Sequence, residues 1–248
     1  MRLTPSVVCA CLLLGSLGTA SADADCDPFA LRSGSYSIER GDTELGTGEI
    51  RLQAGDAPGC YQLVQTAKPH FLLRWLSGPA TQSSEFCRLP DGRLRSYRYK
   101  QHRSGLGAEK ENYSLDFDWD AGTVRGGRFE ELPLDARQTD TLLLATRVRQ
   151  WLCAMPADQR GEAEPLELHY IDHRGADSYT VALMGLQKIQ VPAGEFDALL
   201  VERIDADDRS SKFWLDPADN MRLLRGEQRK RDDPVVRLSY MGPAKAKN

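Results

Sequence analysis

The stretch Asn112-Tyr113-Ser114-Leu115-Asp116-Phe117-Asp118-Trp119-Asp120 decides the fold, because apolar and polar side chains alternate along it. Successive side chains of a β-strand point to opposite faces, so this alternation predicts a strand with one apolar face and one face in water. Strands with one solvent-exposed face are typical of antiparallel sheets, since parallel sheets are buried on both faces. Asp120-Ala121-Gly122 then predicts a tight turn.

The same period of two recurs at residues 49–53, 166–170, 179–183 and 236–240, with short turns rich in Gly, Pro and Asp between such segments. This pattern predicts about 10–11 antiparallel strands. A meander of that length must curl, because twisted open sheets rarely stay flat beyond about ten strands. We therefore expect a mainly β fold, built as a strongly curved antiparallel meander sheet or a partly open barrel.

Residues 139–155 break the period and predict one central helix. The apolar stripe at helical spacing consists of Leu144, Val148, Trp151, Leu152 and Met155. Thr139 or Asp140 can cap its start, and Pro156 ends it. No Pro- or Ser-rich linker flanks the helix, which favours a plug or cap on one continuous sheet rather than a domain boundary.

Residues 1–22 have the pattern of a removable signal peptide, with Arg2, an apolar run and the small residues Ala20-Ser21-Ala22. We expect cleavage after Ala22 and export of a soluble protein to the periplasm. A lipid anchor on Cys26 is disfavoured, because Asp23-Ala24-Asp25 precedes it instead of small residues. Residues 23–242 then form one β-rich domain, and residues 243–248 a disordered tail.

Four cysteines remain after this cleavage, at positions 26, 60, 87 and 153. An even number in an exported chain predicts two disulfides, for which three connectivities exist. We favour Cys60–Cys87, on neighbouring strands, and Cys26–Cys153, because Cys153 points away from the apolar stripe of the predicted helix. Free buried thiols are the alternative.

Composition and motifs exclude several functions. The net charge of −4 argues against nucleic acid or an anionic membrane as the main partner, and no segment after residue 22 has the ~18 consecutive apolar residues of a membrane span. No catalytic, phosphate-binding or dinucleotide motif occurs, so we expect no catalytic residues and no cofactor. His169 and His173 would stand about 13 Å apart on a strand, which disfavours a metal site.

The charged clusters have a plain interpretation. Asp116, Asp118 and Asp120 are expected on a solvated strand face. The basic run at 225–231 is followed at once by Asp232 and Asp233. We interpret it as an exposed hairpin tip rather than an anion site.

Aromatic residues on strand-like segments are the best candidates for lining a cleft: Tyr97, Tyr99, Phe117, Trp119 and Trp214. They can equally belong to a filled core, which is where most aromatic residues of globular proteins lie. A curved sheet that its side chains do not fill leaves a cavity, and small barrels use such cavities for apolar ligands. The sequence does not decide between these interiors.

Over residues 34–241 the chain resembles the DUF3108 family of exported bacterial proteins of unknown function. The resemblance rests on the order and spacing of residues 36–38, 45–50, 117–120, 191–198 and 213–217, with the helix between the third and fourth motif. Met221-Arg222-Leu223-Leu224 departs from the Leu-Pro-Val run that the family usually shows. The family offers no catalytic residues, and its curved sheet is similar to carrier folds that move lipids or lipoproteins across the periplasm.

These observations lead to one main hypothesis and two alternatives. The main hypothesis is a periplasmic, non-enzymatic protein that binds a hydrophobic small molecule or an envelope partner in a curved β cleft. A cell-envelope hydrolase or lyase, with a site built from scattered Asp, Glu and His, is the first alternative. The second is a structural scaffold that pairs with another envelope protein through a sheet edge.

Overall fold

The computed structural model describes residues 26–70, 78–105, 108–205 and 208–244. The predicted signal peptide lies outside these residues, as does most of the predicted tail. The first half of the chain forms the strands β1 (Arg32–Arg40), β2 (Thr43–Ala54), β3 (Cys60–Pro69), β4 (Ala80–Arg88), β5 (Leu94–Arg103), β6 (Tyr113–Asp118), β7 (Thr123–Gly126) and β8 (Phe129–Pro133). The second half forms β9 (Thr139–Asp140), β10 (Leu166–Asp172), β11 (Gly175–Val191), β12 (Gly194–Arg203), β13 (Arg209–Asp216), β14 (Arg222–Lys230) and β15 (Val236–Gly242).

These strands make one 15-stranded, open and strongly curved sheet. Each half of the chain is a meander, and the halves join where β1 pairs with β15. All neighbours are antiparallel except β9 and β10. Strands β8 and β9 are the two edges of the sheet. The predicted class and curvature are confirmed.

The sheet has more strands than the roughly 10–11 expected from alternation. The difference lies in short strands such as β7 and β9, which have only four and two residues. A period of two cannot be recognised over so few residues.

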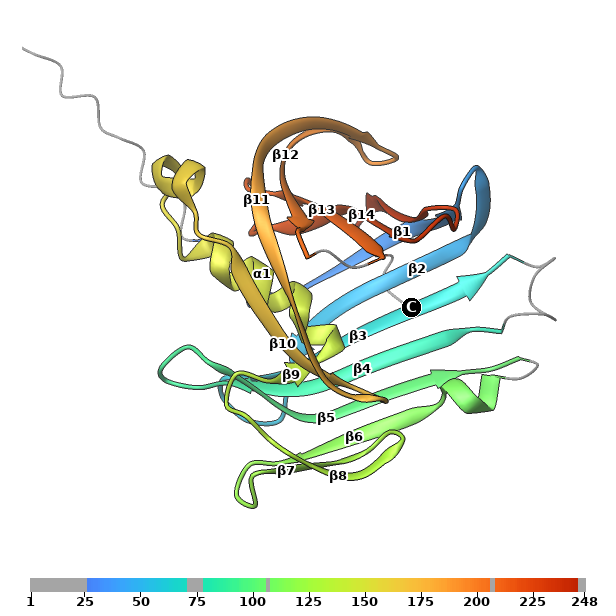
Figure 1. Cartoon of the computed structure of the whole chain (residues 1–248). Helices are drawn as coiled ribbons and strands as arrows, with labels where there is room; N and C mark the ends of the chain where they lie inside the picture. The colour runs from blue at the N-terminus through green and yellow to red at the C-terminus, as the bar shows by residue number, and fades with distance from the viewer. Residues whose placement is uncertain (1–25, 71–77, 106–107, 206–207, 245–248) are drawn as a thin grey trace, which may run out of the picture.

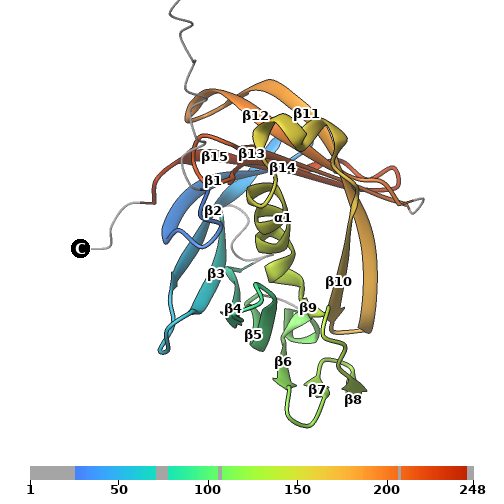
Figure 2. The ribbon, with the colours of Figure 1, turned by 90° about the vertical axis from the view of Figure 1, so that its left-hand side faces the viewer.

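The predicted helix is confirmed with narrower bounds. A short 3-10 turn, η3 (Thr141–Leu143), leads into α1 (Leu144–Cys153), the α-helix of the described residues. Two further 3-10 turns are η2 (Ala108–Glu111) and η4 (Ala157–Glu162). Figure 2 shows α1 inside the curve of the sheet, between β1–β5 on one side and β10–β11 on the other.

Packing against this helix accounts for much of the core. The apolar side chains Val148 and Leu152 of α1 contact buried residues of β10–β13, including Val201 and Leu215. A second cluster covers the wall of β2–β7 and includes Leu143 of η3. A third joins the curled β11–β12 hairpin to β1 and β13–β15. Each large apolar side chain buried in these clusters contributes about 2 kcal/mol, and together these contributions hold helix and sheet together.

Two disulfides are present, and they join the pairs favoured from the sequence. Cys60 and Cys87 are direct cross-strand partners on β3 and β4. Cys26 is bonded to Cys153 at the end of α1, 127 residues further along the chain. The second bond ties the start of the described chain to the helix inside the sheet.

Candidate functional site

The concave wall of β3, β4 and β5 changes character along the strands. Leu63, Ser84 and Tyr99 are direct cross-strand partners, and all are buried where η3 and α1 cover the sheet. Two residues further from the helix, Gln65, Gln82 and Gln101 form the next row on the same face and are only half-buried. The helix therefore fills one half of the concave face and leaves the other half open.

The open half continues onto β2, β1 and β15, where inward-facing side chains are aliphatic. Ile38 on β1, Ile50 on β2 and Leu238 on β15 are half-buried. Their strand pairing places them on the same face as the glutamine row, because Ile50 is opposite Gln65 and Leu238 is opposite Ile38. We call the concave surface that these three residues and the glutamine row form together the inner groove.

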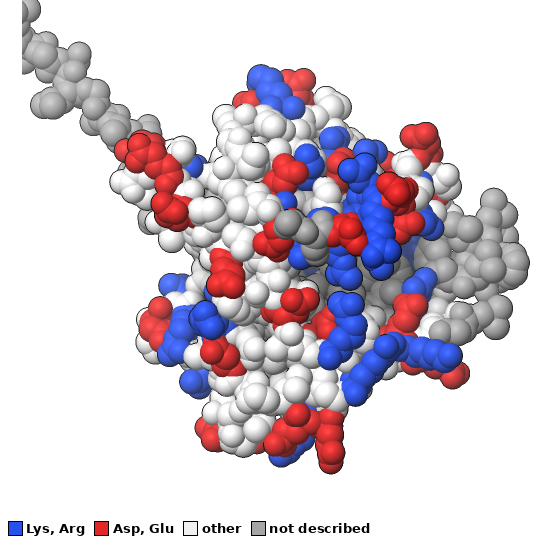
Figure 3. Space-filling model, viewed as in Figure 1, with Lys and Arg blue, Asp and Glu red and all other residues white. Residues whose placement is uncertain are grey.

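Figure 3 shows a hollow on the side of the molecule seen in Figure 1, with Lys and Arg side chains above and below it. A pocket of about 290 Å³, which we call the rim pocket, lies where the ends of β1, β13, β14 and β15 meet. It is lined by Arg40, Arg209, Gln228, Lys230, Asp233, Pro234 and Val236. Cross-strand pairing of Arg40 with Val236 and of Arg209 with Lys230 puts this rim pocket on the face of the inner groove.

The outer face of the same strands carries a neutralised row of charges. Glu39, Arg237, Glu227, Lys212 and Glu202 are consecutive cross-strand partners on β1, β15, β14, β13 and β12. Arg237 bridges Glu39 at 3.2 Å and Glu227 at 2.8 Å, and Lys212 bridges Glu202 at 3.1 Å. Arg237 and Lys212 of this row therefore have carboxylate partners, whereas Arg40 and Lys230 of the rim pocket have no ion pair with a described carboxylate.

The most buried carboxylate of the concave face, that of Asp140, is fully occupied by hydrogen bonds. Its Oδ2 accepts from the Ser84 and Ser96 hydroxyls at 2.6 and 2.7 Å. Its Oδ1 accepts from the backbone N–H groups of Leu142 and Leu143. Burial raises the pKa of the Asp140 carboxyl, and the four donors oppose that rise. Asp140 thus fixes the start of the helix to β4 and β5, and no lone pair is left for an acid–base role.

At β6, next to the open half, aromatic rings from distant segments of the chain are in contact. The Tyr113 ring on β6 lies 5.4 Å from the Tyr99 ring and 5.2 Å from the His173 ring. His173 belongs to the β10–β11 turn, and its carbonyl accepts a hydrogen bond from the Arg128 N–H. The second half of the chain therefore closes against the first half without pairing of the edge strands.

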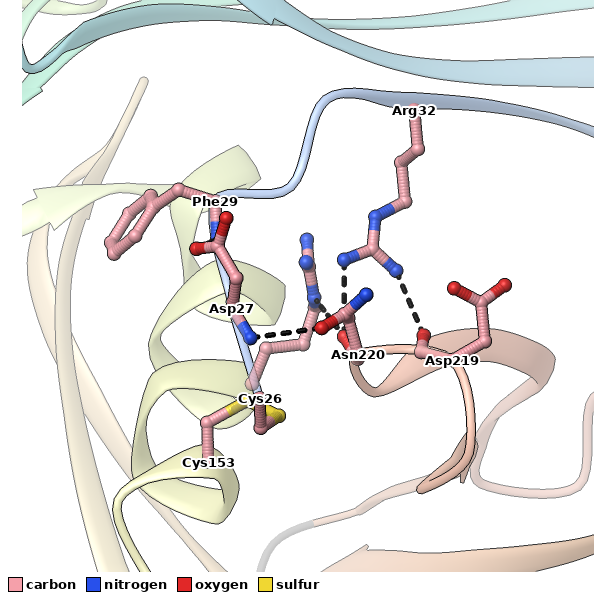
Figure 4. Close-up of a disulfide and its surroundings, with 8 residues drawn as sticks. Cys26, Asp27, Phe29, Arg32, Cys153, Asp219 and Asn220 are labelled. Carbon is pink, nitrogen blue, oxygen red and sulfur yellow. Dashed lines mark hydrogen bonds between the residues drawn. A yellow bond between two sulfur atoms is a disulfide. The ribbon is translucent and has the colours of Figure 1, made fainter. Parts of the chain in front are cut away.

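The N-terminal segment closes the other end of the concave face (Figure 4). The Asp27 N–H donates to the Asn220 Oδ1 at 2.8 Å, next to the Cys26–Cys153 bond. The Arg32 guanidinium donates to the carbonyls of Asp219 and Asn220, both at 3.1 Å. Asn220 needs these contacts, because its φ of 48° is in the left-handed region. The segment thus holds the β13–β14 turn over the end of α1.

Arg149 of α1 points into this same region. Its Nε donates to the Asn220 carbonyl at 3.3 Å, and its buried Nη2 has no hydrogen-bond partner among the described residues. Burial, together with the nearby Arg32 charge, lowers the pKa of Arg149 to about 9. No cavity adjoins this guanidinium among the described pockets, so we assign it to the closed end rather than to a binding site.

The structure distributes the five predicted cleft aromatics over three places. Tyr99 and Phe117 are buried in the core cluster of β2–β7, and Trp214 is buried in the cluster under the β11–β12 hairpin. Tyr97 and Trp119, together with the edge of Phe117, line a separate pocket of about 520 Å³ beside the exposed Asp116 and Asp118. Of the five, only Tyr99 touches the inner groove, through a 3.1 Å hydrogen bond from its hydroxyl to Gln101.

Sequence reasoning missed the glutamine row and the rim pocket. Alternating glutamines look like a solvated strand face, and only the register between three strands shows that Gln65, Gln82 and Gln101 share the inner side. The rim pocket combines residues from both ends of the chain, so no local motif predicts it. The expected solvated face is confirmed for Asp116, Asp118 and Asp120, which are exposed.

Comparison with known proteins places the chain in a family. A family model described as "Protein of unknown function (DUF3108)" matches residues 35–231. The chain belongs to the DUF3108 family. The match confirms the resemblance seen in the sequence, and this DUF3108 protein has no match in a search of curated proteins.

Several solved structures are similar to this chain to different degrees. A beta-barrel-like protein of the DUF1849 domain from Brucella abortus has 13% identity and a TM-score of 0.51, covering 88% of this chain and 100% of its own. MucB has 14% identity and a TM-score of 0.37, covering 91% of this chain and 57% of its own. A Bacteroides fragilis protein, described as exported with a YmcC-like fold, has 10% identity and a TM-score of 0.33, covering 86% and 95%. Only the first similarity is close enough to support a shared fold.

Among the residues that the structure describes, no helix is long and apolar enough to cross a membrane. Within the same residues, no group of three or more His, Cys, Asp and Glu side chains could hold a metal ion.

Proposed function

We propose that this DUF3108 protein is a periplasmic, non-enzymatic binding protein that holds an apolar chain in the inner groove. The observation that carries the proposal is the change along β3–β5 from the buried Leu63 row to the half-buried Gln65 row. The strands continue beyond this change for several residues. Here the packing ends with the helix while the curved wall continues.

The inner groove has a polar side and an aliphatic side, and this supports an elongated ligand that lies along the groove. Ile38, Ile50 and Leu238 offer an aliphatic side that a hydrocarbon chain can cover. Each buried methylene contributes about 0.8 kcal/mol. Two amide NH2 groups of the glutamine row are paired within the protein, since Gln82 donates to Gln101 at 3.1 Å and Gln101 donates to the Glu111 carbonyl at 2.9 Å. Contact with an apolar chain therefore leaves these amides satisfied.

Export supports the same reading. The signal-like residues 1–22 and the two disulfides fit a periplasmic location. In that compartment an apolar molecule needs a protein cover to remain in water. A segment of an envelope protein with an apolar face would fit the same groove, and the experiment below separates this case by mass.

Native mass spectrometry of the protein purified from the periplasm tests the proposal. We expect a bound species that is lost on denaturation and whose mass corresponds to an acylated molecule, or to a peptide if an envelope partner fills the groove. Gln82→Trp should remove it, because the indole projects into the groove. Gln53→Trp on β2 is the matched control, since Gln53 is exposed on the outer face. An apo mass in every preparation, or a ligand retained by Gln82→Trp, contradicts the proposal.

A further inference from the structure

Unlike the charged row on the outer face of β1 and β13–β15, the rim pocket on the inner face contains cations that have no ion pair within the described part of the chain. On the outer face, Arg237 and Lys212 are matched by three glutamates in one cross-strand row. On the inner face, the rim pocket brings together Arg40, Arg209 and Lys230, with Asp233 as the only carboxylate in its lining. Strand pairing creates this contrast, because consecutive residues such as Arg229 and Lys230 project to opposite sides.

The basic run near the end of the chain therefore has two parts. In the sequence, Asp232 and Asp233 follow the run and balance it. In the structure, the Arg231 guanidinium takes Asp208 as its partner at 2.6 Å, outside the rim pocket. Arg40 and Lys230 have no ion pair with any carboxylate that the structure describes. The acidic residues that follow the basic run in the sequence therefore do not form ion pairs with Arg40 or Lys230 at the pocket.

The rim pocket is also continuous with the inner groove. Val236 of the pocket is two residues from Leu238, and Arg40 is two residues from Ile38. Residues two apart on a strand project from the same face about 6–7 Å apart. The aliphatic wall of the groove thus leads directly to the cations at the rim.

From this arrangement we propose that the ligand of the inner groove is an anionic amphiphile, whose head group binds between Arg40 and Lys230. The proposal rests on the proposed function and names the chemical class of its ligand. The alkyl chain lies against Ile38 and Leu238, and the carboxylate or phosphate head stays at the half-open rim. Guanidinium groups suit such heads, because their N–H donors match two oxygens of a carboxylate or phosphate.

The test compares probes with the same 12-carbon chain and different heads, each below its micelle concentration. Dodecanoate, dodecyl phosphate, dodecan-1-ol and dodecyltrimethylammonium are titrated into the mature protein at pH 7.5, with binding followed by isothermal titration calorimetry. We expect both anions to bind about 5–20-fold more tightly than the alcohol, and the cation most weakly, since partly exposed charge pairs contribute on the order of 1 kcal/mol each. Raising NaCl from 0.05 to 0.5 M should reduce the preference. Free phosphate and acetate at millimolar concentration should not displace the anions.

The double variant Arg40→Gln, Lys230→Gln should bind dodecanoate no more tightly than dodecan-1-ol, while its affinity for the alcohol stays within twofold of the parent. The alcohol therefore reports that the groove is intact. Lys212→Gln is the matched control, because this lysine lies on the outer face of β13 and should leave all four affinities unchanged.

Each other outcome has a definite meaning. Equal binding of acid and alcohol overturns the anionic head group and leaves the proposed function standing. A preference for anions that survives in the double variant overturns the assignment to Arg40 and Lys230. If no probe binds, the proposed function and this inference fall together.

Discussion

Replacement of Asp140 by alanine should be the most damaging single change to the junction between helix and sheet. The carboxylate has no exposed surface and accepts from two serine hydroxyls and two backbone N–H groups. Loss of a helix cap costs about 1 kcal/mol. Stranding the hydroxyls of Ser84 and Ser96 in a buried site costs about 1–3 kcal/mol in total, since they can still bond to each other or to a carbonyl. We expect Asp140→Ala to lower the free energy of unfolding by about 3 kcal/mol.

Thermal and urea unfolding of the mature protein, followed by circular dichroism, measures this change. For a domain of this size 1 kcal/mol corresponds to a shift of about 2–4 °C, so the melting temperature should fall by about 9 °C. Asp120→Ala is the control, because Asp120 is exposed and close to the surface turn after β6. It should change stability by less than about 0.5 kcal/mol. A loss below about 1 kcal/mol for Asp140→Ala would refute the anchoring role.

Three further predictions concern the same features. Burial raises the pKa of Asp140 in the folded protein above its value of ~3.9 in the unfolded chain. The stabilising contribution of the protonated carboxyl is therefore complete below pH ~3.9 and is lost as pH rises through the raised pKa. The stability of the parent relative to Asp140→Asn, measured by urea unfolding, should decrease with rising pH. Without reductant, alkylation under denaturing conditions should modify no cysteine of the mature protein, and Cys153→Ser should lower the melting temperature more than Cys87→Ser, because its disulfide closes the longer loop; labelling of all four thiols would contradict the disulfides. N-terminal sequencing of the exported protein should begin at Asp23, and a chain that retains Met1 would contradict cleavage after Ala22.

Local pattern was enough to predict the sheet, its curvature and the single helix. Alternation around Leu115 and Phe117 identifies a one-faced strand without any tertiary information, and the stripe from Leu144 to Leu152 identifies the helix. The cap at Asp140 could be predicted for the same reason, since capping is a local interaction. Its contacts with Ser84 and Ser96 could not, because they bring together residues 44 and 56 positions apart.

The candidate site was hidden because it depends on register and on the end of the helix. Aromatic residues looked like cleft residues, yet Phe117 and Trp214 fill the core, where large apolar side chains gain most from burial. The groove is recognisable only once α1 is known to stop short of the Gln82 row. The rim cations required the pairing of β1 with β15, which joins residues about 200 positions apart in sequence and leaves no local signal.

Photo-crosslinking gives the most direct test that the inner groove holds an apolar chain. A dodecanoate analogue with a diazirine in the middle of the chain is bound to the mature protein, irradiated, and the modified peptides are mapped by mass spectrometry. The adducts should lie on inward-facing residues such as Ile38, Ile50, Gln82 and Leu238, and excess dodecanoate should suppress them. Adducts confined to the outer pocket beside Tyr97, or labelling that excess dodecanoate leaves unchanged, would contradict binding in the inner groove.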